Sequence, residues 1–580
     1  MKNIFSKLFA SITLFIFPTI CFGQISQNEI PTSFLSNVVP VQDVTTKTIQ
    51  KPDLELIAAE DLVLEAEGNI PNIGRLLPLN ISPKNSGEWA VLHNGDRIWR
   101  IKVKSEGAKG LNFYFNNFHI PEGGKLFIYS QDKYEVLGAF TAENNTVSGR
   151  FATDFIHGEV AVIEYYEPAL QKGKGILEIA ELGYAYRFVE ARDNRKSFGD
   201  AASCHVNVGC PEGDLWTDTR KSVVRILLRN RDNIGWCSGS VINNTRYDFT
   251  PYFLTAMHCG MNDFSKRLIP QEDFDQWIFF FNYEIDGCQG AFTEGDLPRN
   301  TMVGATPVSH SNDKGGEEGS DFLLLELKEQ IPIEYEPVFA GWDISEMPSR
   351  SGVSIHHPQG DAKKISTYNT PLESGTFGDE VDDTHWKVIW TQTENGKGAT
   401  EPGSSGSPIF NLGGQIVGTL TGGNASCDKD GRPDYYGKMS YHWESNIVPD
   451  DPREEDDGPD RGLKAWLDPI SSGVQWISSI NYSGNIITGV TSTEKEIFDF
   501  ELFPNPAQNQ IQIDLKNINP NKPVGVKILN YQGQLILGNT FSEGINGEIL
   551  MDISELQKGF YILELEAGNE IPLIKKFIKE

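Results

Sequence analysis

The stretch Gly403-Ser404-Ser405-Gly406-Ser407-Pro408 is the most informative part of this sequence, and it indicates a turn that exposes a serine. The glycines around Ser405 permit backbone conformations that a Cβ atom blocks, and they leave space for a carbonyl group to approach the main chain. The N–H groups of Gly403 and Ser405 are the candidate donors of an oxyanion hole. Turns rich in glycine and serine are common and usually inert, so this interpretation depends on partner residues elsewhere.

A serine needs a base to become a nucleophile near neutral pH, and His258 is the candidate. It lies in Phe253-Leu-Thr-Ala-Met-His-Cys259, where an apolar strand leads into a histidine beside a cysteine. A bridge between Cys259 and the upstream Cys237 would hold the loop that carries His258 against the preceding strand. A structural histidine next to a disulfide is the alternative.

The imidazole in turn needs an acid that holds its tautomer and stabilises the imidazolium, and Asp321 is the best candidate. In Gly319-Ser-Asp-Phe-Leu-Leu-Leu325 it stands at the mouth of an apolar strand, where a carboxylate is partly buried and aimed at a neighbour. An ordinary aspartate at a strand edge is the alternative. Three nearby acids have the pattern of solvated loop charges: Asp313, Glu317 and Glu318.

The order of the candidates along the chain, His258, Asp321 and Ser405, is that of chymotrypsin and differs from the subtilisin and α/β-hydrolase orders. It predicts a mostly β fold with a double six-stranded β-barrel, with His and Asp in one half and Ser in the other. Residues 200–480 resemble the lysyl endopeptidase branch of the trypsin-like serine proteases. The matching stretches span the region: Cys210-Pro-Glu-Gly-Asp214, Tyr252-Phe-Leu-Thr-Ala-Met-His-Cys-Gly260, Ser320-Asp-Phe-Leu-Leu-Leu-Glu-Leu327, Ala340-Gly-Trp-Asp343, Ile355-His-His-Pro358, Thr400-Glu-Pro-Gly-Ser-Ser-Gly-Ser-Pro-Ile409, Tyr435-Tyr-Gly437 and Trp466-Leu-Asp-Pro469.

The cysteines predict disulfides rather than a metal site. Cys21 lies in a predicted N-terminal signal peptide, described below, and six cysteines remain once it is removed. An even number of cysteines in an exported chain favours three disulfides. Six cysteines allow fifteen pairings; the resemblance implies Cys204–Cys427, Cys210–Cys288 and Cys237–Cys259. No spacing is C-x-x-C, which disfavours zinc. The adjacent His356 and His357 point to opposite faces of a strand, and we expect neither metal nor cofactor.

Selectivity for lysine needs a carboxylate at the base of the substrate pocket, because a buried ammonium must be paired. Trypsin has that acid six residues before the serine, where this chain has Ala399. The resemblance implies Asp434 instead, with Asp428 and Asp430 as rivals. A preference for lysine over arginine follows from the resemblance alone, since one aspartate does not decide it.

Three further positions are implied in substrate binding. Gly422 and Gly423 would offer their backbone to an extended substrate as an added β-strand. The family places a histidine near Thr421, stacked on a tryptophan from another loop, and Phe377 is the nearest counterpart of that tryptophan by position. Ser404 stands where trypsin has the aspartate that pairs with a freed N-terminus, so we expect no activation by that ion pair.

The N-terminus has the pattern of a secretory signal peptide, residues 1–23. Lys2 and Lys7 supply positive charge, and an apolar run from Leu8 to Phe22 precedes cleavage after Gly23. A lipoprotein signal at Cys21 is a disfavoured alternative.

Residues 24–196 are expected to form a β-rich propeptide, a β-sandwich, on the strength of strand-like segments between Gly and Asn turns. A polar linker ends at Lys196-Ser197, where a lysine-specific enzyme would cut its own chain.

Residues 197–481 are the expected protease domain. The acidic stretch Asp450 to Asp460 is interpreted as a solvated loop, and the stretch Leu463 to Ile480 is expected to close the domain with a helix. A linker, 482–497, follows it.

Residues 498–580 are expected to form a small β-sandwich that resembles the type IX secretion sorting domain. The stretches that carry this resemblance are Phe503-Pro-Asn-Pro-Ala507, Gly559-Phe-Tyr-Ile-Leu563 and Lys575-Lys-Phe-Ile-Lys579. It implies type IX machinery as a partner, removal of the domain, and a secreted or cell-surface protein. A generic β-sandwich or a carbohydrate-binding module is the alternative.

Composition fits this organisation. The 56 glycines and 31 prolines favour β-rich domains, and the net charge of −30 argues against nucleic acid as a partner. The leading hypothesis is a secreted serine endopeptidase that cleaves lysine-containing proteins and peptides after lysine, through a triad and an acyl-enzyme, as a monomer when mature. The alternatives are the same fold with arginine-accepting or relaxed preference, and an inactive protease-like surface adhesin.

Overall fold

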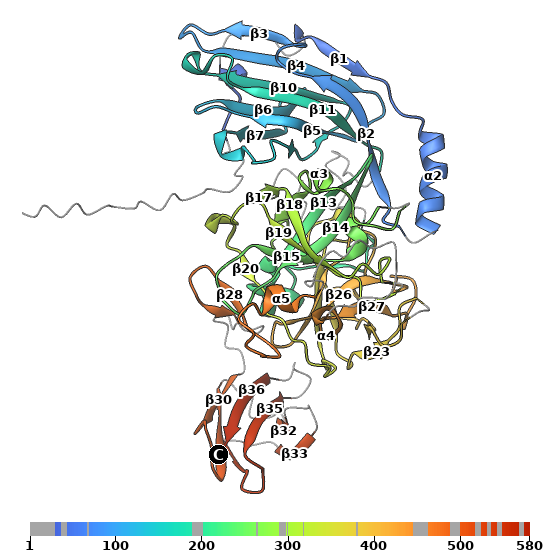
Figure 1. Ribbon diagram of the computed structural model, residues 1–580. Helices are drawn as coiled ribbons and strands as arrows, with labels where there is room; N and C mark the ends of the chain where they lie inside the picture. The colour runs from blue at the N-terminus through green and yellow to red at the C-terminus, as the bar shows by residue number, and fades with distance from the viewer. Residues whose placement is uncertain are drawn as a thin grey trace, which may run out of the picture.

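The computed structural model describes residues 29–35, 43–66, 69–187, 201–262, 265–288, 297, 300–316, 318–378, 381–444, 462–487, 499–516, 524–530, 535–541, 548–567 and 573–580. Three β-rich regions are stacked one above the other in Figure 1, so the predicted mostly β fold is confirmed. Among these residues, no helix is long and apolar enough to cross a membrane. Several predictions fall outside the described residues: the signal peptide and Gly23, Lys196, Glu317 and the acidic stretch from Asp450.

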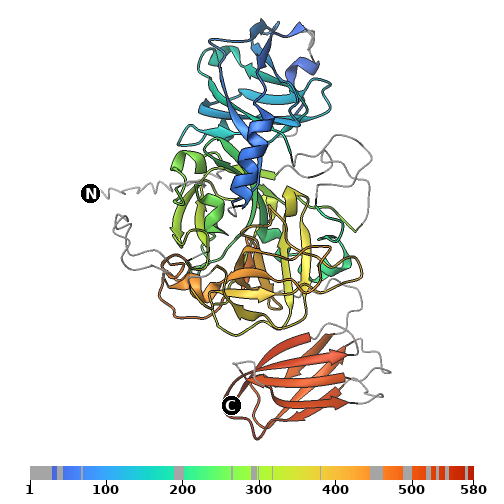
Figure 2. The ribbon, with the colours of Figure 1, turned by 90° about the vertical axis from the view of Figure 1, so that its right-hand side faces the viewer.

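The N-terminal region, residues 29–187, consists of two sheets around one apolar core. One sheet has the order β1 (Thr46–Ile49), β4 (Arg97–Ser105), β10 (Val160–Glu167), β6 (Lys125–Ser130), β7 (Val136–Phe140), with β3 (Glu88–Val91) also on β4. The opposite sheet contains β2 (Asn72–Ile81), β11 (Ile176–Ala185), β5 (Gly110–His119), β8 (Phe151–Ala152) and β9 (Ile156–His157). Helix α1 spans Thr32–Leu35, and α2 (Leu54–Ala66) lies alongside β2 (Figure 2).

The first half of the protease region is a sheet that closes on itself. Its strands are β13 (Val223–Asn230), β14 (Asn233–Val241), β15 (Tyr252–Thr255), β16 (Ile278–Phe281), β17 (Asn300–Val303), β18 (Ala305–His310) and β19 (Leu323–Leu327), with α3 (Gln271–Phe274) beside them. Gly304, with φ of 90°, separates β17 from β18, so that β17 pairs with β16 while β18 pairs with β19. This bend closes the ring, which is called the first barrel below.

The second half is an eight-stranded sheet, called the second barrel below. Its order is β12 (Val206–Asn207), β22 (Lys364–Tyr368), β21 (Gly352–His356), β25 (Pro408–Asn411), β26 (Ile416–Gly423), β27 (Asp434–Lys438), β24 (His385–Val388), β23 (Glu373–Gly375). A hydrogen bond from Thr391 N to Thr367 O draws the two sides of the sheet together. Helix α4 (Met439–Trp443) follows β27.

The end of the protease region departs from the sequence-based boundaries. Only Lys464–Leu467 is helical (α5), since Pro469 cannot continue a helix, and the expected helix up to Ile480 is wrong. The chain instead forms β28 (Ser479–Asn481), which pairs with β20 (Val338–Phe339), and β29 (Ile486–Ile487), which pairs with β28. Tyr482 packs on Phe339 with ring centroids 5.4 Å apart, so the region extends past the expected boundary at 481.

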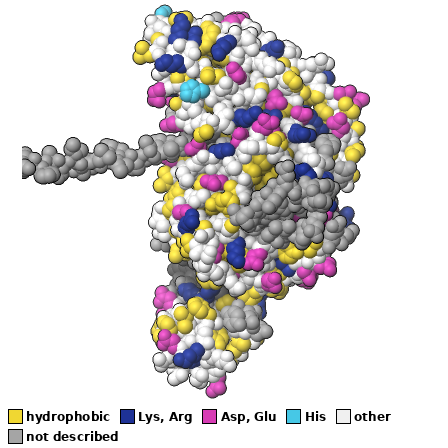
Figure 3. All heavy atoms as spheres, viewed as in Figure 1, with side chains coloured by type: hydrophobic (Ala, Val, Ile, Leu, Met, Phe, Trp, Pro, Cys, Tyr) yellow, Lys and Arg dark blue, Asp and Glu magenta, His cyan; other side chains and the backbone are white. Residues whose placement is uncertain are grey.

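The C-terminal region is a small two-sheet sandwich. One sheet has the order β30 (Asp499–Phe503), β31 (Gln510–Lys516), β34 (Glu548–Asp552), and the other β33 (Leu535–Phe541), β32 (Val524–Asn530), β35 (Gly559–Ala567), β36 (Leu573–Lys579). Lys576 Nζ lies 3.9 Å from the Trp476 ring centroid and touches the protease region. On the face in Figure 3, acidic and basic side chains are intermixed.

Candidate active site

The turn that contains Ser405 is held open by two glycines with positive φ, 93° at Gly403 and 77° at Gly406. A Cβ atom at Gly406 would lie 2.1 Å from Thr255 Oγ1, and one at Gly403 would lie 2.8 Å from His357 O. Ser405 is partly exposed, whereas the residues on both sides of it are buried. The turn therefore presents the serine hydroxyl to solvent and buries everything beside it.

The first barrel fixes the main chain of this turn. Ser238 Oγ donates to Gly403 O at 2.8 Å, and Ser238 N donates to Ser405 O at 2.8 Å. Ser404 N donates to Glu401 O and Gly406 N to Leu420 O, each at 2.9 Å. Within the described part of the chain, the N–H groups of Gly403 and Ser405 have no hydrogen-bond partner. These are the two donors that the sequence predicted for an oxyanion hole.

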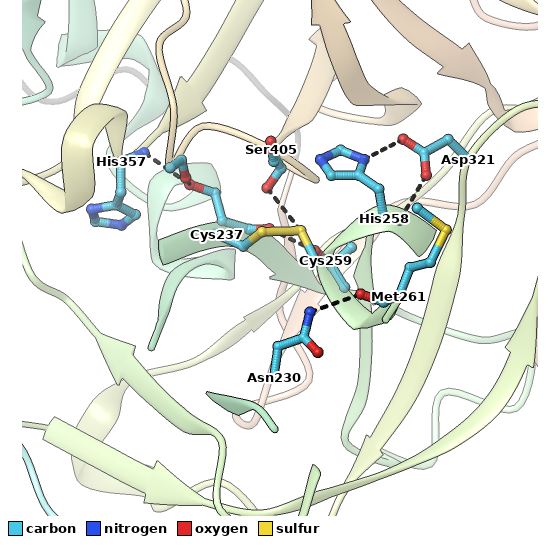
Figure 4. Close-up of a disulfide and its surroundings, with 11 residues drawn as sticks. Asn230, Cys237, His258, Cys259, Met261, Asp321, His357 and Ser405 are labelled. Atoms are coloured by element: carbon cyan, nitrogen blue, oxygen red, sulfur yellow. Dashed lines mark hydrogen bonds and ion pairs between the residues drawn. A yellow bond between two sulfur atoms is a disulfide. The ribbon is translucent and has the colours of Figure 1, made fainter. Parts of the chain in front are cut away.

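His258 and Asp321 form a close pair next to this turn. His258 Nδ1 lies 2.6 Å from Asp321 Oδ2, and His258 N donates to Asp321 Oδ1 at 2.9 Å. Ser405 lies on the side of the imidazole ring away from Asp321 (Figure 4). The structure thus brings the three sequence-predicted residues to one place, with the histidine between the acid and the serine.

The electrostatics of the pair favour a charged aspartate and a basic imidazole. Burial by itself would lower the pKa of His258, but the charge of Asp321 and the hydrogen bond to it raise that pKa above 6.5. Burial would raise the pKa of Asp321, and the charge of His258 and the hydrogen bonds outweigh burial and lower it. His258 is thereby a better proton acceptor than a free imidazole.

The protease region contains three disulfides, in the same pairs that the resemblance implies: Cys204–Cys427, Cys210–Cys288 and Cys237–Cys259. The bridge between Cys237 and Cys259 passes directly beneath the reactive groups, since Cys259 Sγ lies 3.8 Å from Ser405 O (Figure 4). It ties β14 to the short 3-10 helix η6 (Met257–Gly260), which carries His258. One covalent link therefore contacts both the serine turn and the histidine helix.

The interpretation of Asp313 as a solvated loop charge is wrong, because its side chain is fully buried. Asp313 Oδ2 accepts the Asp321 N–H at 2.7 Å, and Asp313 Oδ1 accepts from Ser311 Oγ at 2.7 Å. Burial and the neighbouring charge of Asp321 raise the pKa of Asp313 to about 6. The sequence missed this role because the loop that carries Asp313 folds back under the start of β19, which only the tertiary structure reveals.

Asp434 is buried at the start of β27 and lies against the segment that precedes the serine. Asp434 Oδ2 accepts from Thr400 Oγ1 and from Trp390 Nε1, each at 2.7 Å. A Cβ atom at Gly423 would lie 2.2 Å from Asp434 Oδ1, so a glycine is required there. Burial raises the pKa of Asp434. Trp390 has no sequence signal that links it to this site.

The rival acids lie elsewhere. Asp428 and Asp430 are exposed, and the Asp430 side chain, 97% exposed, pairs with Lys397 at 2.8 Å. Ala399 itself is buried, and its carbonyl accepts from Ser366 Oγ at 3.0 Å. Asp434 therefore reaches the residue next to Ala399 from across the sheet.

Gly422 and Gly423 end β26, beyond the last residue pair of β25 with β26, Pro408 with Thr419. They pair with β27 on one side only, through Tyr435 and Asp434. Their other edge is the one that a substrate strand would meet.

A histidine that the sequence analysis missed contacts Thr421. His385 Nε2 lies 2.9 Å from Thr421 Oγ1, and the Phe377 ring lies 5.5 Å from the His385 ring. Burial lowers the pKa of His385 to about 4. The histidine and the aromatic ring thus come from β24 and the preceding loop, not from the position of Thr421.

Ser404, which stands where trypsin pairs an aspartate with a freed N-terminus, contacts a histidine side chain instead. Its hydroxyl lies 2.7 Å from His356 Nδ1. The neighbouring Glu401 accepts the Ala202 N–H at 3.2 Å and lies 3.3 Å from His205 Nε2. The segment before the serine is therefore tied to the start of the protease region by bonds that need no free amino group.

A closed first barrel, a second sheet and an aspartate-paired histidine beside a serine turn are features of chymotrypsin-like proteases. Together with the matches to known proteins, they identify the chain as a serine endopeptidase. Residues 198–437 match the family model of the lysyl endopeptidase C-terminal domain. Residues 501–580 match the secretion system C-terminal sorting domain, so the protein is secreted or at the cell surface.

Known proteins similar to this chain include a lysyl endopeptidase of Pseudomonas aeruginosa. It is 25% identical over 370 residues, which are 61% of this chain and 75% of the relative. Among solved structures, a thermostable serine protease from an extremophilic microorganism is 12% identical and covers 38% of this chain and 91% of its own, with a TM-score of 0.27. A Glu endopeptidase is 15% identical, and the match covers 40% of this chain and 87% of the endopeptidase, with a TM-score of 0.25.

Proposed function

We propose that this protein hydrolyses peptide bonds on the carboxyl side of lysine, with Ser405, His258 and Asp321 as its triad. Ser405 Oγ attacks the substrate carbonyl carbon while His258 Nε2 accepts the hydroxyl proton. The N–H groups of Gly403 and Ser405 stabilise the oxyanion that forms. The observation that carries this proposal is the His258–Asp321 pair beside a serine turn, in which two N–H groups have no hydrogen-bond partner among the described residues.

The second half of the reaction follows from the same groups. His258 returns the proton to the leaving amine, which breaks the C–N bond and leaves an ester on Ser405. A water then attacks the ester, His258 again accepts the proton, and the released serine recovers it. Asp321 stays ionised throughout and stabilises the imidazolium.

The nucleophile is tested by a Ser405→Ala substitution and by covalent labelling. We expect kcat to fall by about 10⁶-fold, since removal of a triad serine leaves only the oxyanion hole and binding. A fluorophosphonate should label Ser405 in the processed protein and should not label Ser405→Ala. Ser407→Ala is the matched control and should still be labelled. A processed wild-type protein that resists labelling would instead support the adhesin alternative.

Asp434 is proposed to select lysine by pairing with its ammonium group. The carboxylate is 1% exposed, lies beside Gly423 and Thr400, and has no cationic partner among the residues with assigned positions. A buried carboxylate without a counter-ion is costly, and a substrate ammonium would supply the missing charge.

The pocket assignment is tested on peptides that differ only in lysine, arginine or glutamate at the cleavage site. Wild type should favour lysine, and Asp434→Ala should lower kcat/KM for lysine by about 30-fold or more, because an unpaired buried charge costs about 2–5 kcal/mol. Asp430→Ala is the control and should leave the preference unchanged. Equal rates on lysine and arginine would support the relaxed alternative, and an unchanged preference in Asp434→Ala would refute the pocket.

Maturation is proposed to remove the signal peptide after Gly23 and to cut the chain after Lys196. Residues 24–196 would then be a propeptide, 197 to about 487 the monomeric protease domain, the residues from there to 497 a linker, and 498–580 the domain that type IX machinery recognises. The test is N-terminal sequencing of secreted Ser405→Ala protein. If a chain that lacks its nucleophile is still cut cleanly at Lys196, another protease does the processing.

A further inference from the structure

The strands of the first barrel that face the N-terminal region carry buried apolar residues on both faces. On β13, Val224, Ile226 and Leu228 point into the barrel core, whereas Leu227 belongs to the core of the N-terminal region. Five other residues of the protease region join that same core from neighbouring strands: Ile234, Trp236, Ile278, Phe280 and Val303. A barrel exposed to water carries polar residues on its outer face. This face is therefore built to be covered.

Backbone hydrogen bonds also join the N-terminal region to the first barrel. Strand β2 of the N-terminal region pairs antiparallel with β14, with Asn233 opposite Arg75 and Ile234 opposite Gly74. A further hydrogen bond runs from Leu76 N to Asp232 O at 2.8 Å. The sheet of the N-terminal region and the first barrel thereby form one continuous hydrogen-bonded sheet. The linker is not needed for this contact.

Charged and polar side chains complete the contact. Arg229 of β13 pairs with Glu181 of β11 at 2.5 Å and with Asp273 at 2.8 Å, and its side chain is 11% exposed. Gln276 Nε2 donates to the carbonyls of Phe115 and Phe151 at 3.0 and 3.1 Å. These bonds satisfy buried polar groups that would otherwise need water.

The covered face continues to the candidate active site. Trp236, 6% exposed, lies next to Cys237 of the bridge under Ser405, and the Phe155 ring covers it at 6.5 Å. Arg225 packs on Trp236 and donates to Gly360 O at 2.7 Å. The loop that contains Gly360 in turn abuts Gly403.

We propose that residues 43–187 are a noncovalent partner of the first barrel, which stays bound after the linker is cut. The immediate product of cleavage is then a two-fragment complex, with Trp236 still covered beside the serine turn. The inference builds on the proposed maturation, but its physical basis is the shared core and sheet, which do not depend on catalysis by this chain.

The test uses full-length Ser405→Ala protein cut by a trace of trypsin, since the linker contains Arg192, Arg195 and Lys196. After trypsin inhibition, size-exclusion chromatography without denaturant should give one peak that contains both fragments. Two folded fragments that elute separately at micromolar concentration would overturn the proposal. Because trypsin makes the cut, this outcome is independent of whether the protein processes itself.

A matched pair of variants on β11 tests the interface itself. Glu181→Lys places a second cation beside Arg229 and should raise the dissociation constant of the cut complex at least about tenfold. Glu178→Lys makes the same change on an exposed site of the strand and should have no effect. Equal dissociation constants for both variants would contradict the proposed contact. If Glu181→Lys does not fold, Arg150→Glu replaces it and repels Glu272, now 2.9 Å from Arg150.

Discussion

At the scale of single residues, one backbone conformation decides how the acid is used. Asp321 has φ of 61°, a left-handed conformation that costs an aspartate about 1–2 kcal/mol. In return, its two carboxylate oxygens contact both the backbone N–H and Nδ1 of His258. The N–H of Asp321 is itself held by Asp313. A single carboxylate thereby fixes the position of the histidine as well as its tautomer.

Removal of the Asp321 charge should change both the rate and its pH dependence. The raised pKa of His258 means that wild-type kcat/KM rises with pH through a midpoint above 6.5, since the base must be neutral. Asp321→Asn should lower kcat by about 10⁴-fold and move the midpoint to lower pH. Initial rates on a lysine ester between pH 5 and 9 measure both. A midpoint that stays in place would show that another group controls it.

Asp313 should make stability depend on pH. Folding raises the pKa of Asp313 from 3.8 to about 6. The stabilisation that its protonated form contributes is therefore complete below pH 3.8, the pKa in the unfolded chain, and is lost as the pH rises through about 6, the pKa in the folded protein. Asp313→Asn removes this loss, so its melting temperature relative to the parent should increase between pH 4 and pH 7. Calorimetry of both proteins in a Ser405→Ala background measures it. A constant difference would refute the assignment.

At the scale of elements, the serine turn depends on contact between the two halves of the protease region. Strand β14 of the first barrel holds the turn that precedes β25 of the second, through Ser238 and the bridge from Cys237. The same disulfide is bonded to η6, the short helix that carries His258, through Cys259. The reactive geometry is therefore a property of the junction, since neither half contains all of it.

Gly406→Ala should disrupt that junction. Its Cβ atom would clash with Thr255 and with Ala256 N, 2.6 Å away, and would displace Ser405. A displacement of about 1 Å costs about 10²-fold in rate, which is the expected loss in kcat/KM. Gly431→Ala is the control, because Gly431 also has a positive φ, 68°, with open space around it. Similar losses in both variants would mean that backbone strain matters and the close approach does not.

At the scale of the whole molecule, the chain separates catalysis from sorting. The candidate triad, Asp434 and all three disulfides lie between residues 204 and 434. The C-terminal sandwich touches the protease region through Lys576 and through an ion pair of Glu564 with Arg350 at 3.6 Å. The Arg350 side chain is 47% exposed, although that of Glu564 is buried, and surface ion pairs contribute only about 0–1 kcal/mol.

A chain that ends at residue 497 should therefore keep its activity and lose its export. After purification from the cell and processing, kcat/KM should agree with that of the full chain within about twofold, because no proposed substrate contact is removed. Activity assays of the culture medium and the cell extract would locate the enzyme. A large loss of kcat/KM would show that the sandwich supports the site.

The sequence by itself indicated the class of reaction, that of a serine endopeptidase, and the residues proposed to carry it out. Ser405, His258 and Asp321 stand in local patterns with strong requirements for glycine, cysteine or an apolar strand, and such patterns can be read without a fold. Asp434 and the pairing of the six cysteines followed only from the resemblance to a known family. Only the tertiary structure decided which polar residues are buried and which residues far apart in the chain are in contact. It buried Asp313, brought His385 to Thr421 and Trp390 to Asp434, and joined the N-terminal region to the first barrel through Arg229 and Trp236. No local pattern specifies these contacts, because each depends on where segments far apart in the chain meet.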